Sequence, residues 1–216
     1  MNLSYHNDPF PHIEGSLDES LYQEVLDSWN SISHNNHSTA AGNRSNKQLT
    51  EINLNTKLSS IIWNCYENLI NSLVHSYPKL TETEFTLQTR IIYSENIPSE
   101  NSYKIRGWHL DSGDKFLVGL WYFKHPEEPE NSGGDLILMN PKTKKIKVIE
   151  YSSNKFVIFA NTPVAWHSVT DRKPSKYPRR YINLILESTD TKLHNYQRAG
   201  TSVDDEFRGK LVNYYE

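Results

Sequence analysis

Long apolar runs are absent from this chain of 216 residues, and a membrane-spanning helix needs about 18 consecutive apolar residues. The first residues lack a charged segment followed by an apolar stretch, so no secretory signal peptide is expected. Cysteine is also scarce: Cys65 has no second cysteine with which to form an internal disulfide, as is typical of proteins from a reducing compartment. We therefore expect a cytoplasmic protein with no membrane partner.

An excess of basic residues is lacking as well. The 23 Lys and Arg residues are outnumbered by 26 Asp and Glu residues, which gives a formal net charge of -3. Because nucleic-acid-binding surfaces normally carry a basic field, this balance disfavours nucleic acid as a partner. Aromatic residues are abundant by contrast, with 13 Tyr, 7 Phe and 5 Trp, and these side chains suit β-strands. A small molecule or a peptide remains as the expected partner, and the oligomeric state is left open.

Two amphipathic helices are predicted in residues 1–80, which we interpret as a helical support for the rest of the chain. The first helix follows a capping box formed by Ser16 and Glu19, and apolar residues then recur every four positions. The polar segment 31–50, rich in Asn and Ser, is predicted to be a loop. A second apolar periodicity predicts a helix that ends just before Pro78.

From residue 85 onward the sequence changes to short β-type segments separated by turn residues. Such segments without intervening helices are typical of a β-sandwich or a jelly roll. We therefore expect a single domain, 1–216, of the mainly β (α+β) class, with its core at 85–187. Residues 188–216 form a mixed, charged tail whose structure the sequence does not specify. The predicted strands are 85–93, 105–111, 115–124, 134–140, 145–150, 155–160, 164–170 and 179–187.

His109 and Asp111 are the central candidates for a functional site. Alternate residues of a strand face the same side, so His-x-Asp places an imidazole and a carboxylate next to each other. A third ligand would have to come from a distant strand, and the segment AWHSV offers His167. Two histidines and one carboxylate, with open coordination positions, suit a non-haem Fe(II) oxygenase.

Five motifs, in their order along the chain, resemble the Fe(II)- and 2-oxoglutarate-dependent dioxygenases, in particular the prolyl-hydroxylase-like group. The resemblance covers roughly residues 85–187 and implies a double-stranded β-helix supported by two N-terminal helices. It also implies hydroxylation of a C–H bond of a peptidyl proline, an amino acid or a small metabolite, with release of succinate and CO2. The motifs are His109-x-Asp111, the aromatic strand LWYF at 120–123, the turn Gly133-Gly134-Asp135-Leu136, the segment His167-Ser168-Val169 and the arginines that open the last strand.

The same resemblance implies the cofactors and the residues around the metal. The cofactors are Fe(II), 2-oxoglutarate as co-substrate and O2, with ascorbate as an optional reductant. His109, Asp111 and His167 would be the iron ligands, and neutral imidazoles with a carboxylate suit Fe(II). Tyr93 matches a position near the metal that touches the co-substrate or the substrate.

Two adjacent arginines compete for the distal carboxylate of 2-oxoglutarate. The resemblance favours Arg180, because a planar guanidinium can bind a carboxylate through two parallel hydrogen bonds. Tyr122 matches a phenol that donates to the same carboxylate. Arg179 remains a competitor because the loop before the last strand is longer than is usual in the group. If Arg180 faces inward, alternation along the strand places Ile182 and Leu184 on the same side.

A non-redox, cupin-like jelly roll that binds a metal or a sugar is the alternative. Such a module would not need the arginine and tyrosine that the resemblance assigns to the co-substrate. A halogenase is disfavoured because Asp111 occupies a position where those relatives carry a small residue. The substrate itself is left open, because fold analogy does not identify it and the segments expected to contact it, 31–50, 94–104 and 171–178, are loops.

Overall fold

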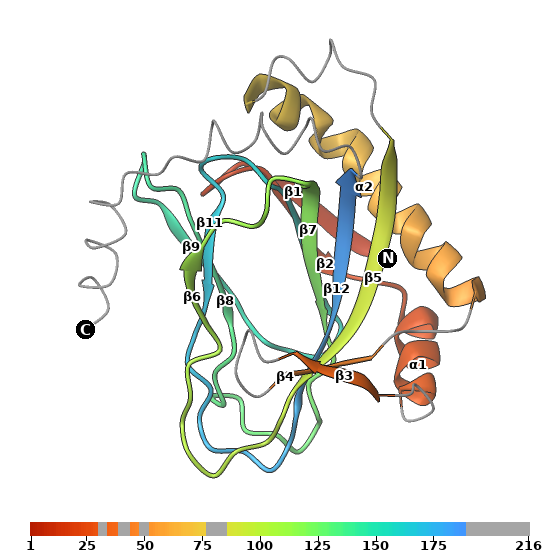
Figure 1. Cartoon of the computed structure of the whole chain (residues 1–216), viewed down its shortest axis with the longest axis vertical. Coiled ribbons are helices and arrows are strands. Elements are labelled where there is room, and N and C mark those ends of the chain that lie inside the picture. Colours follow the sequence, from red (N-terminus) through yellow and green to blue (C-terminus); the bar gives the residue numbers. More distant parts are fainter. Residues whose placement is uncertain (30–33, 39–43, 48–51, 77–85, 189–216) are drawn as a thin grey trace.

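The computed structural model describes residues 1–29, 34–38, 44–47, 52–76 and 86–188. Two antiparallel sheets face each other, and two helices cover the outer face of the larger sheet (Figure 1). The arrangement is a double-stranded β-helix, so the predicted mainly β fold with two supporting helices is confirmed.

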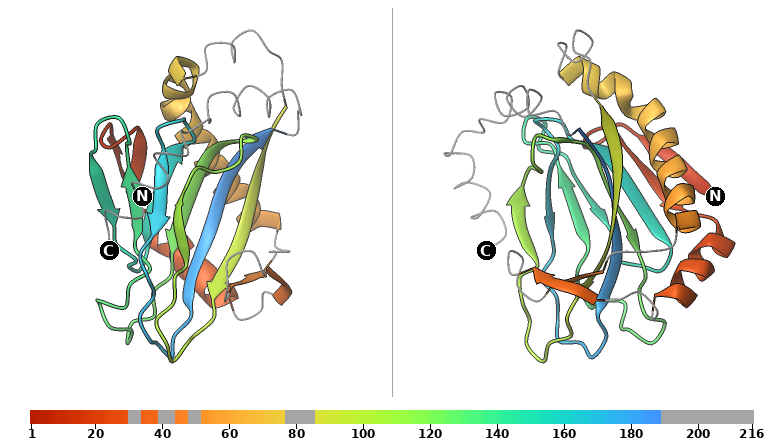
Figure 2. Two further views of the ribbon diagram at one scale, coloured as in Figure 1. Left: turned by 60° about the vertical axis from the view of Figure 1, so that its left-hand side comes forward. Right: turned by 45° about the vertical axis from the view of Figure 1, so that its right-hand side comes forward.

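The larger sheet forms one wall of the molecule, and its long central strands run side by side in both views of Figure 2. In this sheet β12 lies between β5 and β7, so that Ile182 pairs with Tyr93 on one side and with Trp121 on the other. Across the sheet the order is β1 (Asn2–His6), β2 (His12–Ser16), β10 (Lys155–Ala160), β7 (Lys115–Tyr122), β12 (Arg179–Ser188), β5 (Leu87–Asn96), β4 (Arg44–Lys47) and β3 (His34–Ser38).

The smaller sheet carries two of the candidate metal ligands. Its strands, in order, are β6 (Arg106–His109), β11 (Trp166–Val169), β8 (Leu136–Met139) and β9 (Ile146–Ile149). The antiparallel pairing of β11 with β6 places His167 directly opposite His109. Residues far apart in the sequence therefore meet because neighbouring strands of the smaller sheet carry them.

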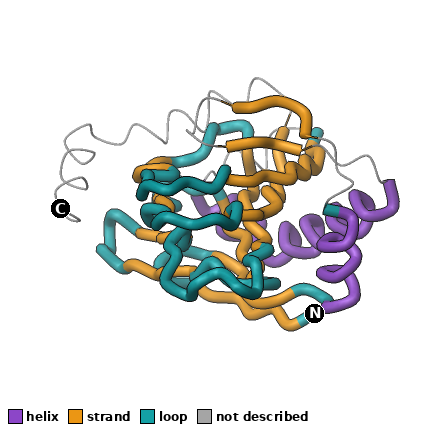
Figure 3. The backbone as a smooth tube through the Cα atoms, turned by 90° about the horizontal axis from the view of Figure 1, so that it is seen from below, coloured by secondary structure: helices purple, strands orange, loops and turns teal. Residues whose placement is uncertain are grey.

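The helices α1 (Glu19–Ser28) and α2 (Ile52–Ser76) lie on one side of the strands (Figure 3). Their apolar faces are buried, including Cys65, and burial raises the pKa of its thiol to about 12, as expected for an inert core cysteine. The predicted capping box is wrong: Ser16 belongs to β2, and α1 begins after Asp18 without a side-chain cap. Within the described residues, neither helix is both long and apolar enough for a membrane span.

Each predicted strand from residue 85 onward has a counterpart in β5 to β12, but four other strands were not predicted. The strands β1 and β2 extend the larger sheet beyond β10, and β3 and β4 lie within the predicted loop 31–50. The polar sequences HNNHS and RSNK lack apolar alternation, so their strand conformation is set by pairing, of β4 with β5 and of β3 with β4, and not by pattern. The rest of that predicted loop, and the tail after Ser188, lie outside the described residues.

Strand alternation divides the buried side chains into two main groups. One group lies between the larger sheet and the helices, and Trp121 and Ile182 belong to it. The other lies between the two sheets and includes Leu120 and Tyr122. Adjacent residues of β7 thus face opposite cores, and some residues of the second core, including Leu120, line the cavity described next.

Candidate active site

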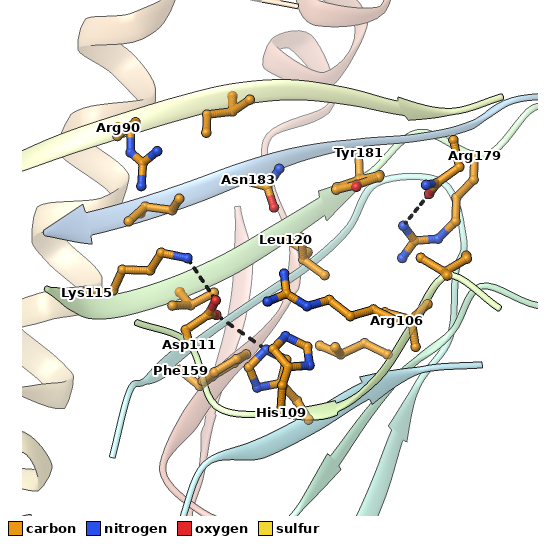
Figure 4. A pocket seen from close by; sticks show the side chains of 18 residues that line it. Arg90, Arg106, His109, Asp111, Lys115, Leu120, Phe159, Arg179, Tyr181 and Asn183 are labelled. Atoms are coloured by element: carbon orange, nitrogen blue, oxygen red, sulfur yellow. Dashed lines mark hydrogen bonds and ion pairs between the residues drawn. The ribbon is translucent and has the colours of Figure 1, made fainter. Parts of the chain in front are cut away.

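His109, Asp111 and His167 converge between the two sheets. Their ligand atoms all lie within 4.8 Å of one another. The two imidazole rings have centroids 4.1 Å apart, and His167 Nε2 lies 3.4 Å from an Asp111 carboxylate oxygen. The structure therefore brings together the three residues that the sequence predicted as one metal site (Figure 4).

Backbone carbonyls orient both histidines. The Nδ1 atom of His109 lies 2.8 Å from the carbonyl oxygen of Gly107, and Nδ1 of His167 lies 3.1 Å from that of Ala165. Donation from Nδ1–H fixes the tautomer that leaves Nε2 as the ligand atom. Burial lowers the pKa of His109 to about 3, so this imidazole is neutral at physiological pH, as metal binding requires.

Asp111 is ionised despite its burial. Burial raises the pKa of its carboxyl group, but the hydrogen bonds and charges of His167 and Lys115 outweigh this effect and hold the pKa well below its usual value. Lys115 Nζ lies 2.8 Å from Oδ1, whereas His167 approaches Oδ2. Lys115 was missed in the sequence, where a lysine four residues after an aspartate is not distinctive. Its position indicates that it orients the carboxylate while one oxygen stays available to a cation.

A cavity of about 260 Å³ connects the three-residue cluster to Arg179. The Arg179 side chain is fully buried, and its Nη2 donates to the Tyr122 hydroxyl at 3.2 Å, while Nη1 donates to Asn96 Oδ1 at 3.3 Å. Its partners among the described residues are uncharged, so no carboxylate in that part of the chain neutralises this guanidinium. A buried charge without a counter-ion is costly, and an anionic ligand would remove that cost.

The structure explains why one position of the predicted turn Gly133-Gly134-Asp135-Leu136, Gly134, is a glycine. Its backbone φ is +90°, and a Cβ atom built at this position would lie 2.6 Å from Cδ of Arg179. Its carbonyl oxygen accepts a hydrogen bond of 2.8 Å from Nε of Arg179. The glycine is therefore needed both for the backbone conformation and for the close approach of the arginine.

Arg180 faces away from the cavity, so the expectation that it faces inward is wrong. Its Nε donates to Glu95 Oε1 at 2.8 Å, and its guanidinium lies 5.7 Å from the Trp29 ring centroid, on the helix side of the sheet. Ile182 and Leu184, which share its side of β12, are buried under the helices. The packing of these apolar residues against the helices sets the register of β12.

The residues of β12 that line the cavity are the alternate set, Arg179, Tyr181, Asn183 and Ile185. Asn183 and Tyr181 follow Arg179 along the cavity wall in Figure 4. Of the two arginines considered for the distal carboxylate of 2-oxoglutarate, Arg179 is thus the one that faces the cavity.

Tyr93 does not lie near the metal cluster, so that expectation is wrong too. The centroid of its ring lies 5.3 Å from the centroid of the Trp29 ring, in the core beneath the helices. On β5 the cavity is lined instead by Arg90, Ile92 and Asn96. Strand alternation again decides the outcome, since Tyr93 is one residue out of phase with these three.

Tyr122 lies on the expected side, between the sheets, with its hydroxyl on Arg179. Burial raises its pKa to about 12, so its phenol stays protonated and can donate to an anion held by Arg179.

A second histidine–carboxylate cluster, formed by His6, His12 and Glu14 on β1 and β2, was not predicted from the sequence. The Glu14 carboxylate already forms ion pairs with Lys147 and Lys155. These two cations disfavour a divalent cation there, so His109, Asp111 and His167 are the stronger metal site.

Comparison with known proteins bears on the family. Residues 100–186 match the family model described as the 2OG-Fe(II) oxygenase superfamily. That segment contains the whole three-residue cluster and Arg179. Comparison with curated proteins gave no match.

Solved structures with similar folds include two prolyl hydroxylases. One, from Trichoplax adhaerens and in complex with a hypoxia inducible factor peptide fragment, has a TM-score of 0.53 and 16% identity, over 89% of this chain and 86% of that one. A prolyl-4-hydroxylase from Pseudomonas putida has a TM-score of 0.56 and 11% identity, over 82% and 91%. IDO from Bacillus thuringiensis has a TM-score of 0.51 and 14% identity, over 83% and 91%.

At these identities the structural likeness concerns the fold, which is that of the prolyl-hydroxylase-like group. The family resemblance rests on residues 100–186, the segment that matches the 2OG-Fe(II) oxygenase superfamily. This segment, which contains the three-residue cluster, is therefore similar to the 2-oxoglutarate-dependent dioxygenases of that superfamily.

Proposed function

We propose that His109, Asp111 and His167 bind Fe(II), and that Arg179 and Tyr122 bind the distal carboxylate of 2-oxoglutarate. When bound, the iron and the co-substrate would supply the oxidising chemistry, in which 2-oxoglutarate and O2 would give succinate and CO2, with one oxygen atom of O2 in the succinate and the other inserted into a C–H bond of the substrate. The substrate is a peptidyl proline, an amino acid or a small metabolite. Ascorbate serves as a reductant that keeps the iron as Fe(II).

The observation that carries this proposal is that a three-residue ligand cluster and an unneutralised guanidinium share one cavity. A dicarboxylic keto acid needs a metal at one end and a cation at the other, and the cavity offers both. The guanidinium of Arg179 is held by hydrogen bonds to Tyr122, Asn96 and Gly134, so its fork is preorganised for a carboxylate. Apolar side chains, including Leu120 and Phe159, line the same cavity and limit the access of water.

The test is a substrate screen with isotopically labelled dioxygen. The protein is incubated with Fe(II), 2-oxoglutarate and ascorbate, together with prolyl peptides, free amino acids or small metabolites in separate reactions. We expect succinate formation to rise with the correct substrate and the label to appear in both succinate and product. Because Asp111 fills the carboxylate position, the product should carry no chlorine even in excess chloride. A chlorinated product, or a product without the label, would contradict the proposal.

Replacing Lys115 with methionine tests how Asp111 is held. Lys115 Nζ hydrogen-bonds the carboxylate at 2.8 Å, and loss of such an outer partner typically costs about 10- to 100-fold in metal affinity. We therefore expect Lys115→Met to weaken Fe(II) binding by roughly that factor, measured by competition with a chelator under anaerobic conditions. The matched control is Lys145→Met, since Lys145 pairs with the exposed Asp8 and should not affect the metal. Equal Fe(II) affinities in the two variants would show that Lys115 does not position Asp111.

A further inference from the structure

The strand that carries His109 contains a β-bulge, and this bulge turns Arg106 toward the cavity. On the facing strand, Val169 lies two residues after His167, yet its partner Arg106 lies three residues before His109. In a regular strand, residues three apart face opposite sides. The extra residue therefore places Arg106 on the same side as His109, and both side chains line the cavity.

The bulge is held by side-chain hydrogen bonds. The hydroxyl of Ser168 donates to the carbonyl oxygen of Arg106 at 3.1 Å, and Nδ1 of His109 lies 2.8 Å from the carbonyl oxygen of Gly107. The local geometry thus aims the Arg106 side chain, and bulges beside active sites commonly serve this purpose. Figure 4 shows Arg106 extending into the cavity between Leu120 and His109.

Of the four cations on the cavity wall, only Arg106 and Arg179 have no acidic partner in the described part of the chain. Arg90 is bound to Glu187 through contacts of 2.6 and 3.0 Å. Lys115 is bound to Asp111, which is the one acidic residue among the described residues lining the cavity. Arg106 is exposed at this wall, where an incoming anion can reach it.

The proposed cofactors leave the charge of Arg106 unneutralised. Asp111 and the near carboxylate of 2-oxoglutarate would offset only two of the three positive charges that Fe(II) and Lys115 bring to the metal end of the cavity. The distal carboxylate would offset Arg179, which lies at the other end of the cavity. A further anionic group beside the metal would therefore be attracted to Arg106, and the substrate is the remaining molecule that can supply one.

We propose that the primary substrate is a small molecule with a free carboxylate, and that Arg106 binds this carboxylate beside the metal. The inference rests on the proposed function of the site. The cavity volume of about 260 Å³ is near the lower end of ligand-pocket sizes and must also hold the co-substrate, which favours a small substrate. Bidentate binding by a guanidinium would fix the orientation of the substrate and so select the C–H bond that reacts.

The test compares carboxylates with their neutral analogues. Free L-amino acids and short carboxylic acids are each paired with the corresponding primary amide, and succinate formation and product mass are measured for both. We expect acids, and not their amides, to stimulate succinate formation and to gain one oxygen atom. Arg106→Gln should raise KM for the best acid roughly 10- to 100-fold, and Arg106→Lys should recover part of this loss. Lys142→Gln, which changes an exposed cation outside the cavity wall, should leave KM unchanged.

A separate titration of 2-oxoglutarate with Fe(II), without substrate and without oxygen, distinguishes this inference from the proposed function. Failure of the wild-type protein to bind 2-oxoglutarate would overturn the proposed function itself. If wild type binds it and Arg106→Gln binds it equally well, while only the acid KM changes, the inference is supported. The inference is overturned if amides stimulate succinate formation as well as acids do, or if neither class stimulates it. It is also overturned if Arg106→Gln weakens 2-oxoglutarate binding and leaves KM for the acid unchanged.

Discussion

Arg179→Ala is expected to weaken 2-oxoglutarate binding by about a hundredfold or more, while Fe(II) binding is retained. The arginine is buried beside the uncharged groups of Tyr122 and Asn96, so its loss would leave the distal carboxylate without a counter-charge. Removing one partner of a buried pair costs roughly 3–5 kcal/mol, and about 1.4 kcal/mol corresponds to tenfold in affinity. Arg179→Lys should recover only part of the loss, because an ammonium group cannot reproduce the planar fork. Titration of 2-oxoglutarate under anaerobic conditions with Fe(II) present measures these differences.

The adjacent residue provides the matched control. Arg180 pairs with Glu95 on the other side of the sheet, and its side chain is 27% exposed. Arg180→Ala should cost no more than about 1 kcal/mol of stability and leave 2-oxoglutarate affinity unchanged, because partly exposed ion pairs contribute little. Loss of affinity in the Arg180 variant but not in the Arg179 variants would mean that the register of β12 is displaced by one residue in the active protein.

The double variant His109→Ala/His167→Ala is expected to lose Fe(II) binding. Only Asp111 of the three-residue cluster would remain, and removal of metal ligands should exceed the roughly 10- to 100-fold cost typical of their outer partners. Metal analysis of protein reconstituted with Fe(II), alongside thermal unfolding to confirm folding, measures the effect. The control is His6→Ala, which changes the second histidine cluster and should leave the metal content unchanged. Retention of iron in the double variant together with its loss in the His6 variant would move the metal to that second cluster.

The three residues of the metal cluster could be predicted from the sequence because two of them depend on a short-range rule and the third on the order of motifs. His109 and Asp111 are two residues apart, which fixes them on one side of a strand wherever that strand lies. His167 was added by the order of motifs, and the pairing of β11 with β6 places it opposite His109. Predicted strands and helices likewise followed from local periodicity and turn residues, so the fold class was correct.

The expected positions of Arg180 and Tyr93 were wrong for a common physical reason. Which of two adjacent residues faces the cavity depends on the register of a whole strand, and a shift of one residue exchanges the two faces. The register of β12 is set by the packing of Ile182 and Leu184 beneath the helices, and Tyr93 on the neighbouring strand packs there too. These are contacts between distant parts of the chain, and local sequence patterns do not determine them. The bulge that turns Arg106 toward the cavity also depends on the pairing of distant strands, so local sequence patterns do not predict it.

The most direct test of the account is a crystal structure of the protein grown without oxygen in the presence of Fe(II) and 2-oxoglutarate, with anomalous scattering recorded at the iron edge. We predict one iron peak between His109, Asp111 and His167, with the distal carboxylate of 2-oxoglutarate on Arg179. An iron peak at His6, His12 and Glu14 instead, or a distal carboxylate that avoids Arg179, would contradict it.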